Sequence, residues 1–166
     1  AKSVSDMFDS QCEKYGLKRP RLVAEPGRYI SADAGFLVSR VTVVKDGYKK
    51  FVGIDAGSND MPRPAIYGAY HHVSVVNDSS DKETVSVVGR ICENSDQFAK
   101  DRLLPVCEPG DVLVIHTCGG HAYAMGSNYN GRPRHAEYLL ALDGDFKQIR
   151  REETIEDLFK TTNYGN

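Results

Sequence analysis

The residues with the greatest capacity for chemistry lie in three polar stretches of this chain. Arg63 stands between prolines, on a stiffened backbone that suits a guanidinium held for a carboxylate. Cys92 and Glu93 directly follow the strand expected over Val85 to Ile91, which places a thiol and an acid together at the end of a strand. Tyr129, within SNYNG, can present its hydroxyl to an anion. The three stretches could therefore offer a cation, an acid, a thiol and a phenol to one ligand.

Taken singly, each of these residues has an ordinary explanation, which its spacing favours. Arg63 reads as a surface arginine in a turn, and Cys92-Glu93 as a buried cysteine beside a solvated glutamate. Tyr129 can simply occupy a turn. Glu25, before a Pro-Gly pair, is either an acidic partner for a ligand or a charge at a strand end. Spacing alone does not define a site.

Several other kinds of site are excluded. His71 and His72 are adjacent, so on a strand they point to opposite faces and cannot share a metal. The other histidines show no zinc-like spacing, and neither GxGxxG nor GxxxxGK[ST] occurs. Lys plus Arg is 21 against 23 for Asp plus Glu, a net charge of −2, which argues against a general nucleic-acid binder.

Composition favours a soluble protein of the cytoplasm. The hydrophobic fraction of 40% is enough for a core, and no apolar run approaches the roughly 20 residues of a membrane span. The first residues lack the basic and apolar stretches of a signal peptide. The cysteines show no CxxC spacing and are expected to be free thiols in a reducing compartment; they are Cys12, Cys92, Cys107 and Cys118.

Short β-rich runs separated by turns must position these residues. Asp46-Gly47 is a strong hairpin signal, and Thr154 is expected to cap a helix over 155–160. Long connections are expected at 57–68 and 92–105, with a Gly-rich stretch at 119–134. The pattern predicts a mostly β protein, a sandwich or barrel. The expected strands are residues 36–44, 49–55, 70–76, 83–91, 112–117 and 136–142.

The start of the chain has a different pattern. Apolar residues from Val4 to Tyr15 recur at helical spacing, and Gly16 is suited to a helix C-cap. A short strand is expected at 21–25. A helix followed by a strand is typical of the last unit of an α/β domain. We therefore expect residues 1–28 to be the remnant of one domain and 29–166 to form a second.

Four motifs occur in order: EPGR, DAGSNDMPRPAIYGAYH, GRICENSDQFAKDRLLP and SNYNGRPRHAEYLL. Together they resemble the fold-type III pyridoxal-phosphate decarboxylases of the ornithine, arginine and diaminopimelate group, and among these the diaminopimelate decarboxylases. The resemblance runs from about Arg21 to the final helix. It implies a (β/α)8 barrel that holds pyridoxal 5'-phosphate, followed by a Greek-key-like β-barrel domain. EPGR would lie on the last strand of the first barrel.

The resemblance also implies a cofactor role for several residues. Glu25 matches the carboxylate that pairs with the pyridine nitrogen and keeps the ring a good electron sink. Gly27 matches the residue whose backbone approaches the phosphate, and Arg28 and Tyr129 match residues near the cofactor. No lysine here matches the cofactor lysine, which belongs to the upstream barrel. This polypeptide alone is therefore expected to be inactive and to lack bound cofactor.

Further residues match substrate contacts of the family. Arg28 and Arg63 correspond to arginines that hold the substrate, with Tyr67 and Tyr129 beside them. Glu93 would answer the distal amine of diaminopimelate, and the arginines its distal carboxylate. Cys92 matches a cysteine that reaches across a dimer interface and is a candidate proton donor. The resemblance therefore implies a homodimer with shared active sites.

The function implied is the decarboxylation of meso-2,6-diaminopimelate to L-lysine in lysine biosynthesis. A sibling enzyme for another basic amino acid or a carboxylated polyamine remains open, as do a non-catalytic relative and a plain β-barrel interaction domain. Arg63 with Cys92-Glu93 favours diaminopimelate. The sequence departs from the family's usual pattern beside the expected site, which bears on fine specificity; the departures are Arg90, Thr117, Cys118, Gly119, Gly120 and His121.

Overall fold

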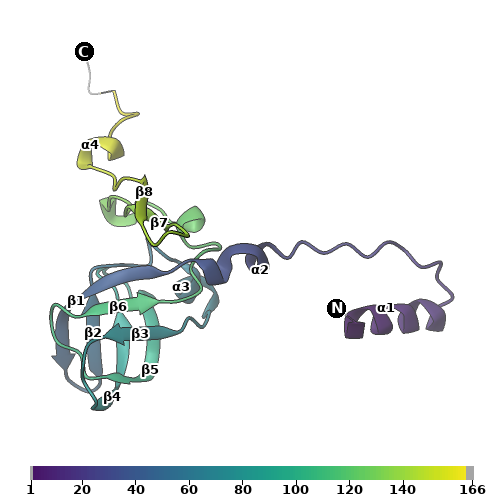
Figure 1. Ribbon diagram of the computed structural model, residues 1–166, viewed down its shortest axis with the longest axis horizontal. Helices are drawn as coiled ribbons and strands as arrows, with labels where there is room; N and C mark the ends of the chain where they lie inside the picture. The colour runs from purple at the N-terminus through teal and green to yellow at the C-terminus, as the bar shows by residue number, and fades with distance from the viewer. Residues whose placement is uncertain (1, 164–166) are drawn as a thin grey trace.

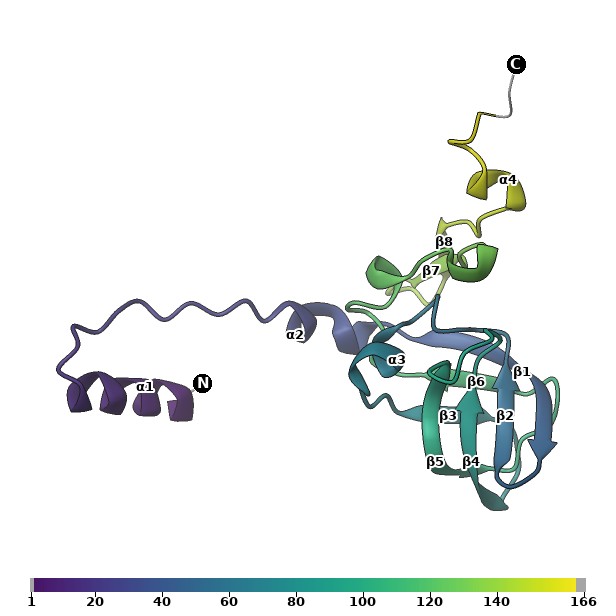
Figure 2. The ribbon, with the colours of Figure 1, turned by 180° about the vertical axis from the view of Figure 1, so that it is seen from behind.

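The computed structural model describes residues 2–163, and it consists of a β-barrel with two projecting arms (Figures 1 and 2). Helix α1 (Lys2–Lys14) ends before Gly16, whose φ of 61° is the left-handed conformation of a helix C-cap. The helix prediction is confirmed. Cys12 is its one buried residue, and residues 15–26 run away from the barrel as extended chain.

The strand expected at Arg21–Glu25 is wrong for this chain. The segment is extended but forms no ladder, and Leu22 and Val23 are 50% and 63% exposed. A strand is stabilised by hydrogen bonds to a neighbour, and within residues 2–163 none lies beside it. Gly27 and Arg28, expected at the end of that strand, instead open the short helix α2 (Gly27–Ser31).

Six strands form one sheet in the order β3-β6-β1-β2-β4-β5. All neighbours are antiparallel except β2 and β4, which are parallel. The outer strands β3 and β5 contact each other, and the Arg102 side chain on β5 donates to the carbonyl of His71, 3.4 Å away. The sheet is therefore a nearly closed barrel, which confirms the fold class. Its strands are β1 (Leu37–Asp46), β2 (Lys50–Ile54), β3 (Val73–Val76), β4 (Lys82–Val88), β5 (Gln97–Pro105) and β6 (Val112–Ile115).

Alternating side chains fill the barrel. The first half of β1 buries every second residue, and β6 buries Leu113 and Ile115 completely. The hairpin predicted at Asp46-Gly47 is present, with the Gly47 N–H donating to the Lys49 carbonyl at 3.1 Å. The buried core combines residues from β1 to β6 with Met61 from the connection after β2.

The long connection expected at 92–105 is wrong, because most of it is strand β5. Three charged residues, Lys100 to Arg102, interrupt its apolar pattern. Asp101 has a φ of 45°, and its N–H donates to the Ser86 hydroxyl at 3.1 Å beside an irregularity in the register with β4. A bulge disrupts the period-two signal on which a strand prediction depends.

The C-terminal arm holds a small hairpin, β7 (Glu137–Leu140) with β8 (Phe146–Arg150). Strand β8 was not predicted, because its sequence, FKQIR, shows no clear alternation of apolar and polar residues. In the structure all five residues are exposed. Thr154 caps helix α4 (Ile155–Leu158) in a capping box with Asp157, so that prediction is confirmed with a shorter helix. No helix within residues 2–163 is long and apolar enough to cross a membrane.

The two ends of the barrel differ in their connections. Short turns at 47–49, 77–81 and 106–111 close one end. The other end carries the segment before β1 and the long connections after β2, β4 and β6. The one after β2 contains helix α3 (Arg63–Tyr67), which the sequence had not indicated within 57–68. We call this second end the loop end.

Candidate functional site

The candidate residues of the barrel all lie on connections of the loop end. Glu25, Gly27 and Arg28 precede β1, and Arg63 and Tyr67 belong to α3 after β2. The remaining three, Cys92, Glu93 and Tyr129, follow β4 and β6. The topology therefore gathers four separate parts of the sequence at one end of the molecule.

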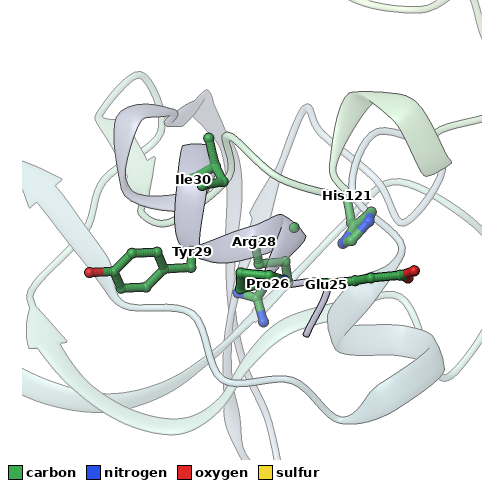
Figure 3. A pocket seen from close by; sticks show the side chains of 7 residues that line it. Glu25, Pro26, Arg28, Tyr29, Ile30 and His121 are labelled. Atoms are coloured by element: carbon green, nitrogen blue, oxygen red, sulfur yellow. The ribbon is translucent and has the colours of Figure 1, made fainter. Parts of the chain in front are cut away.

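The segment before β1 forms an open hollow of about 770 Å³ with the connection after β6. Glu25, Gly27, Arg28 and His121 are among its lining residues. In Figure 3 the carboxylate of Glu25 and the ring of His121 lie on the same side of Arg28, and Tyr29 points the opposite way. His121 is thus a further candidate residue. The sequence analysis had noted it only as a departure from the family pattern.

Gly119 allows the backbone of the connection after β6 to lie directly against the segment before β1, the two segments that form this hollow. Its N–H donates to the Ala32 carbonyl at 2.9 Å, and the neighbouring Cys118 N–H donates to the Gly35 carbonyl at 2.7 Å. A Cβ on Gly119 would lie less than 3.0 Å from the carbonyl oxygen of Ser31. A glycine is required here because any side chain would separate the two segments.

The charges of Arg28 and Arg63 both act on one buried histidine. His71 is 1% exposed, and its Nδ1 lies 2.9 Å from the His116 carbonyl, which makes Nδ1 the protonated nitrogen. Burial, with the charges of Arg63 and Arg28, lowers the pKa of His71. Nε2 of His71 and Nε of both arginines are buried without a hydrogen-bond partner among residues 2–163. Two guanidinium groups, each with an unpaired Nε–H, thus act electrostatically on one neutral imidazole.

A second hollow of about 200 Å³ is lined by α3 together with Glu93 and Tyr129. Ala65 and Ile66 of α3 line it, together with Ser58 and residues of the same loops. The Ser58 hydroxyl donates to Glu93 Oε1 at 3.3 Å. Helix α3 therefore places its middle residues, Ala65 and Ile66, in the same hollow as Glu93.

Cys92 is the exposed thiol of the loop end. Its Sγ lies 3.5 Å from Nδ2 of Asn130, which ties it to the loop of Tyr129. By contrast, burial raises the pKa values of Cys107 and Cys118 to about 11. Those two thiols stay protonated at neutral pH and are poor nucleophiles.

Sequence reasoning missed the buried polar residues beneath these loops. Ser58, Asn59 and Asp60 are all buried, although SND reads as an ordinary turn. Asp60 accepts hydrogen bonds from the Gly57 N–H at 2.9 Å and from Asn59 at 3.2 Å, and its carboxylate lies 3.1 Å from His135. No local signal distinguishes such a buried loop from an exposed one.

The loop of Tyr129 is anchored at both ends. The Ser127 N–H donates to the Asn59 carbonyl at 2.9 Å, and Asn128 donates to the Arg132 carbonyl at 3.0 Å.

The ring of Tyr123 lies between the guanidinium groups of Arg134 and Arg150, at 3.6 and 4.4 Å. Within residues 2–163 no group of three or more His, Cys, Asp or Glu side chains could hold a metal.

A family model described as the pyridoxal-dependent decarboxylase C-terminal sheet domain matches residues 7–119, which is most of the chain. This chain belongs to the pyridoxal-dependent decarboxylases. The family resemblance inferred from the four motifs is confirmed.

Within this family, the diaminopimelate decarboxylase of Methanothermobacter thermautotrophicus is 44% identical over 165 residues. Protein TabA of Pseudomonas amygdali pv. tabaci is 48% identical over 83% of this chain and 33% of that protein. The crystal structure of diaminopimelate decarboxylase from M. jannaschii with L-lysine superposes with a TM-score of 0.84 at 40% identity, covering 99% of this chain and 38% of that one. The chain likewise spans 38% of the length of the Methanothermobacter decarboxylase.

The residues around the larger hollow fit pyridoxal phosphate chemically. Glu25 has no ion pair or hydrogen bond from its carboxylate within residues 2–163, so it is free to meet a protonated ring nitrogen. A Cβ on Gly27 would meet nothing closer than 4.0 Å in this chain, and its φ is not left-handed. Since neither crowding nor backbone conformation requires this glycine, the space is available to a ligand.

Proposed function

We propose that this chain is the C-terminal part of a diaminopimelate decarboxylase, an enzyme that converts meso-2,6-diaminopimelate to L-lysine and CO2. The observation that carries the proposal is that Arg28 and Arg63 each bury an Nε without a partner among the described residues at the end of the barrel where Glu93 lines a hollow with α3. A ligand with both a carboxylate and an amine at its far end needs such a combination of charges. The identities to diaminopimelate decarboxylases support it.

Residues 1–28 would belong to an upstream cofactor-binding barrel, and 29–166 to the β-barrel domain. Glu25 would hold the ring nitrogen, Gly27 would admit the phosphate to the backbone, and Arg28 and Tyr129 would lie beside the cofactor. When bound, pyridoxal phosphate supplies an electron sink for the electrons that the departing CO2 leaves behind. Its lysine, and most of its binding site, would come from the upstream barrel.

Within this scheme the chain's own residues select the substrate and move a proton. Arg63 and Arg28 would bind the distal carboxylate, Glu93 the distal amine, and Tyr67 would pack against Arg63, whose guanidinium lies 5.5 Å from its ring centroid. Cys92 would donate the proton that replaces CO2. Its exposure fits a site completed by a second subunit, so the parent would be a homodimer. Four free thiols would suit a reducing compartment, the cytoplasm.

Arg63→Ala in the full-length parent tests the proposal. We expect kcat/KM for meso-2,6-diaminopimelate to fall roughly 30- to 150-fold, because a lost hydrogen-bonded charge costs about 2–3 kcal/mol. The inhibition constant of L-lysine, the product, which has no distal carboxylate, should change much less. Arg40→Ala is the matched control, since Arg40 donates to the Gly110 carbonyl away from the loop end.

The alternative functions give different results in the same assay. A sibling enzyme would show little change with diaminopimelate in Arg63→Ala and a preference for another basic amino acid. A non-catalytic relative would release no CO2 from any of these substrates. Protein TabA is 48% identical and its name states no reaction. For this reason the assay includes other basic amino acids besides diaminopimelate.

A further inference from the structure

Asp96 is a buried carboxylate with no role in the site described so far. It is 2% exposed. Its Oδ1 accepts from the Ser58 N–H at 2.7 Å, and its Oδ2 accepts from the Ile91 N–H at 2.7 Å. Burial raises the pKa of Asp96, with the two backbone donors acting in the opposite direction. Burying a carboxylate costs desolvation free energy, which the hydrogen bonds from two backbone N–H groups offset.

These two bonds join the connections that carry the proposed substrate residues. Ile91 directly precedes Cys92-Glu93, and Ser58 lies in the connection that leads to α3. The Asp96 N–H donates to the Glu93 carbonyl at 3.2 Å, so residues 91–96 form a closed turn. Ser58 adds its hydroxyl to Glu93 at 3.3 Å. One side chain therefore sets the distance between the Cys92-Glu93 turn and the connection to α3.

Gly89 gives independent evidence that this space is reserved. A Cβ at position 89 would lie less than 3.0 Å from three atoms of the Asp96 carboxyl group. The Gly89 N–H also donates to the Asp96 carbonyl at 2.9 Å, which fixes the backbone around the side chain. Glycine at 89 leaves room for the carboxylate to reach both donors.

We infer that Asp96 is a positioning residue that holds Cys92 and Glu93 at a fixed place relative to α3. The inference rests on the proposed function for its effect on catalysis, because Glu93 and Cys92 are the amine-binding and proton-donating groups there. Its effect on geometry is independent of that function. Misplacing a reacting group by about 1 Å can cost roughly a hundredfold in rate.

Asp96→Asn is the direct test, since the amide nitrogen cannot accept and leaves one backbone N–H unpaired. In this chain we expect Cys92 to be alkylated by iodoacetamide at a rate at least about threefold different from wild type, as the turn loosens. In the full-length parent we expect kcat for diaminopimelate to fall more than KM rises. Asp111→Asn is the matched control, because Asp111 likewise accepts from a backbone N–H, that of Glu108 at 2.9 Å, and from Asn77 at 2.8 Å, but at the other end of the barrel.

Unchanged alkylation of Cys92 in a folded Asp96→Asn protein would overturn the inference, as would a change equal to that of Asp111→Asn. If Asp96→Asn does not fold, Gly89→Ala displaces the same carboxyl group and should alter Cys92 alkylation. Hydrogen exchange in the wild-type chain needs no variant: the Ser58 and Ile91 amides should be protected together, and fast exchange of either contradicts the inference. If the full-length parent does not decarboxylate diaminopimelate, the proposed function is wrong. The alkylation and hydrogen-exchange tests of the position of Cys92 and Glu93 are unaffected by that result.

Discussion

Desolvation governs the ionisation of His71 at the residue scale. Its pKa lies below the ordinary value of 6.5. Just below pH 6.5 the histidine is therefore protonated in the unfolded chain and still neutral in the native state. Stability should therefore fall as the pH drops through about 6.5. The raised pKa of Asp96 acts oppositely, because its native form gains a proton first as the pH falls. The two groups can be separated by mutation.

We expect His71→Asn to reduce the loss of stability between about pH 7.5 and pH 5.5, because Asn keeps a donor for the His116 carbonyl and does not titrate. Urea unfolding midpoints at both pH values measure this. An equal pH dependence in His71→Asn and wild type would assign the acid sensitivity to another group.

At the scale of elements, the site depends on how closely the segment before β1 approaches the connection after β6. Gly119→Ala should destabilise the chain by about 1–3 kcal/mol, because its Cβ meets the Ser31 carbonyl and the two backbones must separate. Gly120→Ala is the matched control, since its Cβ would have ordinary contacts no closer than 3.5 Å. Denaturant unfolding of both variants checks the difference. Similar stability for the two would show that the segments separate without cost.

At the scale of the whole molecule, the N-terminal arm is independent of the barrel. Residues 15–26 are all exposed, and Figures 1 and 2 show them leading α1 away from the body. Brief trypsin treatment should therefore cut after Lys18 or Arg21 first, and the remaining barrel should keep its thermal midpoint. Mass spectrometry of the first product and a melting curve test this. A first cut inside β1–β6 would contradict it.

The amino-acid sequence by itself determined the local features that need only neighbouring residues. The apolar spacing of α1, the Asp46-Gly47 hairpin, the Thr154 cap and most strands follow from periodicity and turn chemistry. The four motifs determined the family, because side chains in that order carry its chemistry. The strand at 21–25 was wrong because a strand needs a hydrogen-bonded neighbour, and residues 2–163 place none beside this segment.

Only the tertiary structure decided which residues share a site. The bulge at Asp101 concealed β5, and the closure of the barrel placed connections far apart in sequence at one end. His71 and Asp96 acquire their properties from burial and from donors on other connections, and a linear pattern carries neither. Long-range contact, in which desolvation and hydrogen bonding act together, converts ordinary loop residues into a positioned set of charges.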